Sequence, residues 1–197
     1  MEKVQIRPAK AADCRAVAAI YHDYVVNTVA SLELDPPTCD EMACRICACG
    51  EFYPFLVCEV EGKVAAYTHA GRHLEQPAFD WNATVSTYVE QTMSGKGIGR
   101  ALLDALEGVL RVMGVINLYS AVTFHARSQY FHIANGFTEA GRFREVVYKQ
   151  GMWRDLAYYE KSLALHDKTP APVRSVKEIE AAQLQEICDR AAKRIRI

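Results

Sequence analysis

The sequence predicts one mixed domain of the α+β class, followed by a C-terminal appendage. Three features predict this fold class: runs of alternating apolar and polar residues, a strongly amphipathic helical stretch near the middle, and the turn Glu61-Gly62-Lys63 between two strand-like runs. A length of 197 residues favours a single domain, and a chain that is 50% hydrophobic can bury a substantial core.

The elements are expected in the order strand, two helices, three strands, helix, strand, helix and two strands. Pro8 should end the first strand, and Gly114 and Gly136 should end two of the helices. In chain order the expected ranges are 3–9, 10–28, 38–50, 55–60, 64–71, 83–89, 97–114, 115–122, 126–135 and a strand pair within 137–163.

The C-terminal part of the chain should form a segment of its own that follows this domain. We divide the chain into a domain over residues 1–165, a linker over 166–176 rich in breakers and polar residues, and a helix over 177–197. The helix has acidic residues at its start and basic residues at its end, which suits the helix dipole. Its apolar face consists of Ile179, Leu184, Ile187, Cys188 and Ala191. Such a face should dock on the domain or on a second subunit.

Charge and hydropathy exclude several classes of partner. The formal net charge of −1 supplies no long-range field that would attract nucleic acid or a membrane surface. The N-terminal "MEKVQIRPAK" lacks the apolar segment of a secretory signal, and no apolar run approaches the roughly 18 residues of a membrane span. We therefore expect a cytoplasmic protein with no nucleic-acid or membrane partner.

The cysteines allow two interpretations. Five of the seven lie between Cys39 and Cys58, and the closely spaced thiols of "CRICACG" could hold zinc or iron. Because a second CxxC pair is missing, we favour a helix capped by Thr38 or Asp40, with buried cysteines kept reduced and no metal. The odd total also argues against a disulfide framework.

The stretch "YVEQTMSGKGIGRALL" predicts an anion-binding loop between a strand and a helix. Gly95, Gly97 and Gly99 have no side chains, so main-chain N–H groups and the helix N-terminus can approach phosphate oxygens closely. Lys96 and Arg100 add positive charge. A tight turn without a ligand is the alternative. A P-loop would need Gly-Lys-Ser/Thr, and a dinucleotide site would need G-x-G-x-x-G with a later acid; the sequence has neither.

Several blocks in a fixed order resemble one family. "STYV", "SGKGIGRALL", "HARSQYFHIANGF" and "YKQGMWRDL" are similar to segments of the GCN5-related N-acetyltransferases (GNAT), in particular the phosphinothricin and methionine sulfone or sulfoximine subgroup. The resemblance covers about residues 4–163. It implies a central, mostly antiparallel twisted sheet flanked by helices, acetyl-CoA as co-substrate without a metal, and a homodimer.

The resemblance assigns the cofactor contacts by position. The main chain of Thr87, Tyr88 and Val89 should bind the pantetheine arm as an added strand would. His125 stands where relatives have an Asn that touches the cofactor, and Ser94 stands where they have Arg or Gln. The loop residues expected to hold the diphosphate are Gly95, Lys96, Gly97, Ile98, Gly99 and Arg100.

The same resemblance leaves the catalytic base open. Relatives carry a Glu on the strand before the glycine loop, and here Thr84 takes its place. A hydroxyl cannot act as a base near neutral pH, so three alternatives remain. Another carboxylate serves, water takes the proton of an already partly neutral amine, or the protein binds acetyl-CoA without catalysis. The carboxylates considered are Asp35, Glu33, Asp80 and Glu90.

His132 is the second catalytic candidate. It stands four residues before the Gly of "GF", where relatives protonate the coenzyme A thiolate, and an imidazole can deliver that proton. A half-buried structural histidine is the alternative. The Val89 amide, or its neighbour at the end of the strand, is expected to stabilise the oxyanion.

The acceptor is expected to be a small, amino-acid-like primary amine of the phosphinothricin or methionine sulfone type. Its pocket should be bordered by the loop that contains Asp35, by the stretch after Arg72, and by "YKQGMW". Cations suit an anionic acceptor, because carboxylates and phosphinates pair with Arg or Lys. The substrate-binding candidates are Asp35, Arg72, Lys149 and Trp153, with His73 beside them.

Overall fold

The computed structural model describes residues 3–123 and 126–197. The predicted α+β class and element order are confirmed, with seven strands and five α-helices in this part of the chain. They are β1 (Val4–Pro8), α1 (Cys14–Asn27), α2 (Cys39–Gly50), β2 (Phe55–Val60), β3 (Lys63–Arg72), β4 (Asn82–Val89), α3 (Ile98–Met113), β5 (Asn117–Thr123), α4 (Ala126–Ala134), β6 (Thr138–Lys149), β7 (Met152–Ser162) and α5 (Ala181–Ala192).

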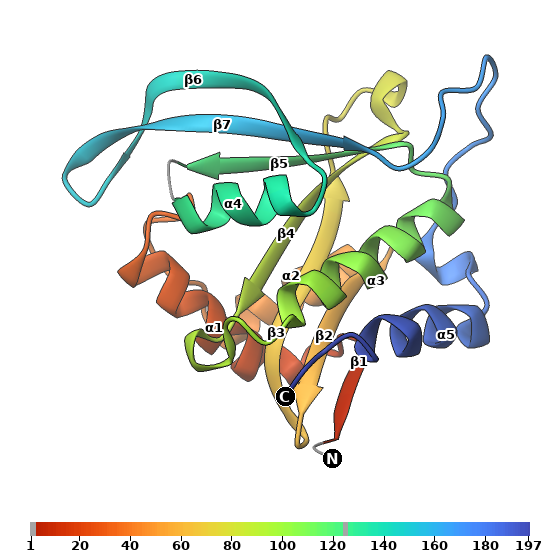
Figure 1. The fold of residues 1–197 in the computed structure, drawn as a ribbon, viewed down its shortest axis with the longest axis horizontal. Coiled ribbons are helices and arrows are strands. Elements are labelled where there is room, and N and C mark those ends of the chain that lie inside the picture. The colour runs from red at the N-terminus through yellow and green to blue at the C-terminus, as the bar shows by residue number, and fades with distance from the viewer. Residues whose placement is uncertain (1–2, 124–125) are drawn as a thin grey trace.

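The seven strands form one sheet in the order β1-β2-β3-β4-β5-β7-β6. All neighbours are antiparallel except β4 and β5. Helix α3 joins this one parallel pair, as a parallel connection requires a crossover. Figure 1 shows β6 and β7 as a long hairpin that extends over one side of the molecule.

Helices cover both faces of the sheet (Figure 1). Both faces need a cover because strands such as β2 bury alternate side chains on opposite faces of the sheet. Leu56 and Cys58 belong to the core under α3 and α5, whereas Phe55 and Val57 belong to the core under α1 and α2.

Two glycines fix the ends of α3. Gly97 precedes the helix with φ 82°, and Gly114 follows it with φ 96° and donates its N–H to Leu110 O and Arg111 O. Both are left-handed conformations that glycine adopts without steric cost. The face of α3 between them is buried against the sheet and α5. The sequence signals for this helix are therefore local and strong.

The cysteine-rich helix differs from its prediction in two respects. Thr38 caps α2 together with Glu41, as expected, but Met42 and Ile46 form the buried face, which leaves Cys44 and Cys47 exposed. The expectation of buried cysteines is wrong for these two residues, because their helix positions point away from α1. In addition, Cys14 and Cys39 form a disulfide between the starts of α1 and α2, contrary to the expectation of reduced thiols. Among the described residues, no three His, Cys, Asp or Glu side chains lie close enough together to bind a metal ion.

The C-terminal helix α5 packs on α3 and β1. Its buried residues Ile187, Cys188 and Ala191 belong to the same core as α3, and Gly108 of α3 lies so close to Ile187 that a Cβ there would be 2.8 Å from its side chain. The segment before α5 is held to the domain by hydrogen bonds, including Trp81 Nε1 to Ala171 O at 2.8 Å. No helix in residues 3–123 and 126–197 has both the length and the apolar character needed to cross a lipid bilayer.

Candidate active site

A cleft opens where β4 and β5 separate. The two strands pair only at Asn82–Thr84 with residues 117–119, and beyond this point they diverge (Figure 1). The gap is a cleft of about 790 Å³ lined by β4 and β5, by α1 and α4, and by the loop that enters α3. A sheet that splits in this way exposes main-chain hydrogen-bonding groups at its centre.

The open edge of β4 lines this cleft. Residues 85–89 pair with β3 on one side only, and Thr87, Tyr88 and Val89 all lie on the cleft wall. The ring of Tyr88 packs edge-on against Tyr24, with ring centroids 4.9 Å apart. The side chain of Tyr88 therefore belongs to the aromatic core, and its main chain is what the strand offers to a ligand.

Tyr24 occupies part of this edge. Its hydroxyl donates to Val89 O at 2.8 Å and accepts from the Val89 N–H at 3.2 Å. The Val89 amide, expected from the sequence to stabilise an oxyanion, thus already has a partner. It can serve that purpose only if the Tyr24 hydroxyl moves aside.

The glycine loop forms the end of the cleft. Gly95 and Gly97 have φ of 84° and 82°, and both line the cleft with Ile98, Gly99 and Arg100. The first N–H groups of α3 have no acceptor within the helix, and the residues that carry them line the cleft. A Cβ on Gly99 would be 3.3 Å from Phe131 and 3.4 Å from Val89, so glycine allows α3, α4 and β4 to meet here. The glycines thus leave the main chain of the loop open to the cleft.

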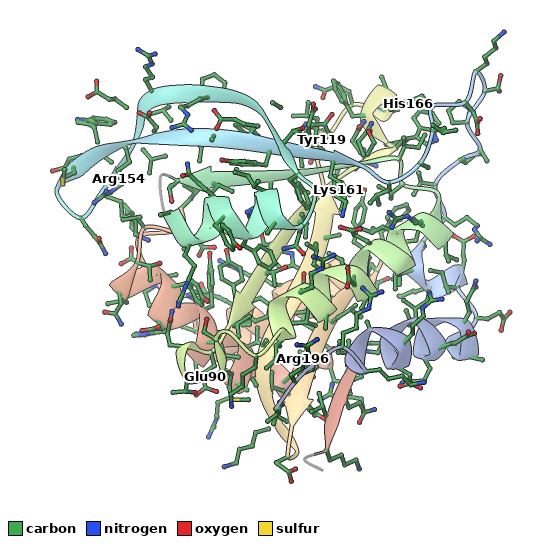
Figure 2. All side chains as sticks on the ribbon, viewed as in Figure 1. Glu90, Tyr119, Arg154, Lys161, His166 and Arg196 are labelled. Carbon is green, nitrogen blue, oxygen red and sulfur yellow. A yellow bond between two sulfur atoms is a disulfide. The ribbon has the colours of Figure 1, made fainter. Side chains whose placement is uncertain are left out.

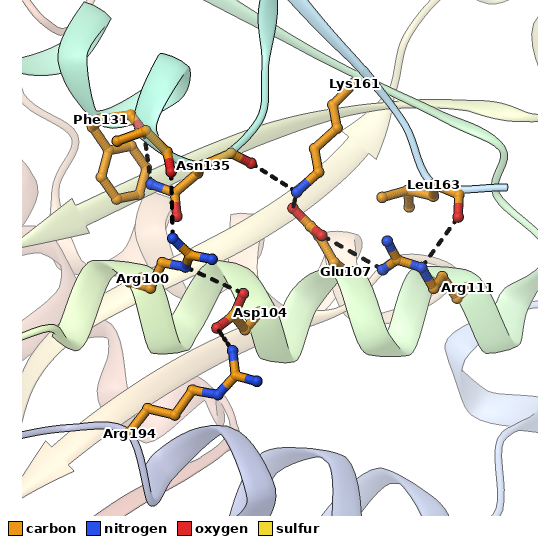
Figure 3. A network of polar contacts seen from close by, with 10 residues as sticks. Arg100, Asp104, Glu107, Arg111, Phe131, Asn135, Lys161, Leu163 and Arg194 are labelled. Atoms are coloured by element: carbon orange, nitrogen blue, oxygen red, sulfur yellow. Dashed lines mark hydrogen bonds and ion pairs between the residues drawn. The ribbon is translucent and has the colours of Figure 1, made fainter.

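Arg100 and Arg127 supply positive charge at the cleft, whereas Lys96 does not line it. The ammonium of Lys96 lies 3.5 Å from Met93 Sδ. Arg100 donates to Ala134 O at 3.3 Å and forms an ion pair of 3.6 Å with Asp104 (Figure 3). Asp104 also pairs with Arg194, so the carboxylate is shared between two guanidinium groups.

His132 lies on the cleft wall and is largely neutral near pH 7. Its Nδ1 is 2.7 Å from Ser128 O, and because a carbonyl only accepts, Nδ1 carries the proton. The ring is surrounded by Phe131, Phe137 and Tyr159, and burial lowers its pKa. The free Nε2 lone pair suits a proton acceptor, in contrast to the donor role implied by the resemblance.

Thr84 lies at the point where β4 and β5 separate. Its hydroxyl donates to Gly71 O at 3.3 Å across the β3–β4 pair. Thr84 itself does not line the cleft; the lining on β4 begins with the next residue, Val85.

The carboxylates considered from the sequence do not line the cleft. Glu33 accepts from Arg45 and Tyr21, Asp80 pairs with Arg72 at 3.2 Å, and Asp35 and Glu90 are exposed. Among the described residues, Asp23 of α1 is the carboxylate that lines the cleft, and it accepts from Asn27 Nδ2 at 2.6 Å. The sequence analysis missed Asp23; its place beside Tyr24, at the edge of the apolar stripe of α1, was the available signal.

The substrate-binding candidates do not line this cleft. Arg72 is engaged with Asp80 and Glu75 O, Asp35 is exposed, and Trp153 packs on Tyr148 on the exposed hairpin. Lys149 is only 4% exposed, and its ammonium donates to Ser31 O at 2.8 Å and Glu33 O at 2.9 Å. Lys149 therefore holds the loop after α1 in place, and burial lowers its pKa.

A second cleft of about 550 Å³ adjoins the first and shares residues with it. Arg127, Gln150 and Arg154 line it, and Arg154 Nε is buried without a hydrogen-bond partner. Gln150 belongs to the stretch "YKQGMW" that was expected to border the acceptor pocket, whereas Arg127 and Arg154 were not predicted from the sequence. His125, expected to touch the cofactor, lies outside the described residues.

Comparisons with known proteins agree with this geometry. Residues 6–157 match the family model described as an acetyltransferase (GNAT) domain. The phosphinothricin N-acetyltransferase of Streptomyces viridochromogenes is 32% identical over 177 residues, which are 89% of this chain and 96% of that protein. An L-methionine sulfoximine/L-methionine sulfone acetyltransferase of Pseudomonas aeruginosa is 32% identical over 80% of this chain and 94% of its own.

A solved structure extends the similarity to three dimensions. A GNAT superfamily phosphinothricin acetyltransferase from Sinorhizobium meliloti, solved in complex with acetyl-CoA, superimposes with a TM-score of 0.81 at 32% identity. The match covers 85% of this chain and 93% of that one.

Proposed function

This chain belongs to the GNAT acetyltransferase family, and from that premise we propose that it transfers the acetyl group of acetyl-CoA to the amine of a small amino-acid-like acceptor. Relatives named for phosphinothricin and for methionine sulfoximine or sulfone indicate the acceptor class. The single observation that carries the proposal is the cleft between β4 and β5 with the glycine loop at its end.

The residues at this cleft fit acetyl-CoA. The amides at Gly95–Arg100 would hold the diphosphate, and the open main chain of Thr87–Val89 would hold the pantetheine arm. A Cβ at Gly95 would meet no atom within 4 Å, so the loop leaves room for phosphate oxygens against its main chain. The bound cofactor supplies the activated acetyl thioester.

Two groups could accept the amine proton in place of the missing glutamate. Asp23 and His132 Nε2 both border the cleft, and each can hold a proton that the hydroxyl of Thr84 cannot. Water remains a third acceptor for an amine that is already partly neutral. Asp23→Asn and His132→Gln, made as separate variants and assayed over pH 6–9, would distinguish these groups. A change in the pH dependence of the rate that is confined to one variant identifies the group that accepts the proton.

For the acceptor, we propose that its anionic group pairs with Arg127 and Arg154 in the second cleft. This is supported by the positive charge of both residues, the unpartnered Arg154 Nε and the continuity of the two clefts. Arg72 stays a candidate, provided that the acceptor replaces Asp80 as its partner. Asp35, Lys149 and Trp153 rest on the resemblance alone.

The second candidate function is an acetyl-CoA-binding protein without catalysis, motivated by Thr84 at the glutamate position and by Ser94 and His125 at family cofactor positions. Thiol release from acetyl-CoA, measured with phosphinothricin, methionine sulfone, methionine sulfoximine and the proteinogenic amino acids, separates the two. Turnover on any of them supports the enzyme. Calorimetric binding of acetyl-CoA with no turnover across the panel supports the binding protein, and absence of binding contradicts both.

We also propose that two copies associate through the β6–β7 hairpin. Large apolar side chains are exposed there, and such patches on a soluble protein mark contact surfaces. They are Phe143, Val146, Tyr148, Met152 and Trp153. Light scattering should give twice the chain mass for the native protein and the monomer mass for Trp153→Glu.

The cytoplasm is the compartment we propose for the reaction. The five cysteines outside the disulfide are unpaired, which suits a reducing environment, and there the Cys14–Cys39 bond should be open. Thiol counting tests this on protein that is denatured in the presence of an alkylating agent directly on cell lysis, so that buried thiols also react: seven free thiols are expected, the number in the sequence.

A further inference from the structure

The last five residues of the chain, 193–197, lie against the glycine loop, and we call them the C-terminal arm. Figure 1 shows the chain leaving α5 and running back toward the start of α3. The arm ends in a direct main-chain contact, because the Arg196 N–H donates to Lys96 O at 3.2 Å. Two residues a hundred positions apart in the sequence are thus joined at the candidate diphosphate site.

The contact continues at Gly97. A Cβ built on Gly97 would be 3.5 Å from Arg194 O, so the arm lies within van der Waals contact of the space where any other residue would begin its side chain. Gly97 also lines the cleft. The loop is therefore in contact with the cleft and with the arm at the same residue, and a shift of the arm would move the loop.

Charge connects the arm to the cleft as well. Arg194 forms an ion pair with Asp104, which also pairs with Arg100 of the cleft wall (Figure 3). Without Arg194, the single negative charge of Asp104 would act on Arg100 alone. With Arg194 present, the three groups sum to one positive charge, and Arg100 keeps more of its attraction for an anion.

The arm has a rigid base. Ile195 packs partly buried against the core, and α5 is fixed on α3 by the close approach of Ile187 to Gly108. The side chains of Lys193 and Arg196 make no ion pair with other described residues. Figure 2 shows Arg196 in the lower part of the molecule and Arg154 on the β6–β7 hairpin.

We propose that the C-terminal arm is part of the cofactor site: it holds the glycine loop in its anion-binding conformation and, through Arg194 and Asp104, keeps Arg100 available to the diphosphate. Arg194 is a positioning residue, because it acts through Asp104 and Lys96–Gly97 rather than on the acetyl group. The proposal rests on the proposed use of acetyl-CoA. It predicts an effect on cofactor affinity and none on acceptor affinity.

The test compares the full chain with Arg194→Ala, Arg194→Lys and a chain that ends at Ala192, which keeps α5 intact. Lys177→Ala is the matched control, because Lys177 also forms a surface ion pair in the C-terminal segment, with Glu51, at 2.6 Å. Calorimetry gives the Kd for coenzyme A, and steady-state assays give KM for acetyl-CoA and for the acceptor.

We expect Arg194→Ala to weaken coenzyme A binding about threefold, as loss of an exposed ion pair would. Removal of the arm, which also removes the bond to Lys96 O, should weaken it about tenfold or more. Arg194→Lys should recover most of the affinity, and Lys177→Ala should bind as the full chain does. KM for the acceptor should stay unchanged in all of them.

Two results would overturn the proposal. In one, the shortened chain binds coenzyme A within about twofold of the full chain, a difference too small to reflect a lost hydrogen bond. In the other, dephospho-coenzyme A, which lacks the 3′-phosphate, loses no affinity on removal of the arm although coenzyme A does, so the arm would contact that phosphate and not position the loop. If the full chain itself binds no coenzyme A, the proposed function fails first. Hydrogen exchange of the Lys96–Arg100 amides then still reports whether the arm holds the loop.

Discussion

Substitution of Gly95 by Ala tests the anion-binding loop with little structural ambiguity. Gly95 has φ 84° and lines the cleft, and a Cβ at this residue would meet no atom within 4 Å. In the free protein the methyl group would enter open space, so the cost is that of a left-handed backbone, about 1–2 kcal/mol. In the complex the same methyl group would stand where phosphate oxygens approach the main chain.

The expected loss of affinity is large. If the methyl group prevents two charge-assisted hydrogen bonds of about 1.5–3 kcal/mol each, binding of coenzyme A weakens by at least about 100-fold. Calorimetric titration of the variant with coenzyme A gives the Kd, and urea unfolding gives the free energy of unfolding.

Gly62→Ala provides the matched control. Gly62 has φ 75° and likewise no atom within 4 Å of its virtual Cβ, but it lies in the β2–β3 turn and does not line the cleft. Both variants should lose similar stability, and only Gly95→Ala should lose coenzyme A affinity. Equal affinities of the two variants would refute the assignment of the diphosphate to this loop.

Three further predictions follow from single side chains. Thr84→Glu should raise kcat/KM by about 100-fold in a thiol-release assay, with KM for acetyl-CoA unchanged, since it restores a carboxylate where the resemblance places one, next to Val85 of the cleft wall; a fall in kcat/KM would show that this carboxylate is not what the site lacks. Burial lowers the pKa of His69 to about 4, so between about pH 6.5 and pH 4 this imidazole is protonated in the unfolded chain and neutral in the folded one. The free energy of unfolding, measured with urea, should therefore decrease by about 1–3 kcal/mol as the pH falls from 6.5 to 4. His69→Phe, which keeps the stack on Phe55, should make this pH dependence weaker. Lys149→Met should lower the free energy of unfolding by about 1–3 kcal/mol, because two loop carbonyls lose their donor; unchanged stability with a raised KM for the acceptor would instead make Lys149 a substrate ligand.

Local patterns in the sequence were sufficient to predict the fold. The glycines at 97 and 114 mark the two ends of α3 because their left-handed conformations depend on residue type more than on context. The alternation in β2 and the Glu61-Gly62 turn likewise specify a hairpin from neighbouring residues alone. The glycine loop was found for the same reason.

The rest of the site depends on contacts between distant segments, which no local pattern encodes. Asp23 reaches the cleft only because α1 packs beside the end of β4, where Tyr24 contacts Val89. Lys149 resembled a surface cation in the sequence, yet the loop after α1 closes over it. The arm contacts Lys96 through main-chain atoms, for which side-chain identity carries little information.

The most direct test of the account is a titration of the isotope-labelled protein with coenzyme A, followed through its amide NMR signals. We predict that the amides of Gly95, Gly97 and Gly99 shift strongly and together at one binding stoichiometry, while Gly62 and Gly114 stay unchanged. Binding of coenzyme A that leaves the three loop amides unmoved, or no binding at all, would contradict the claim that this loop and the cleft beside β4 form the cofactor site.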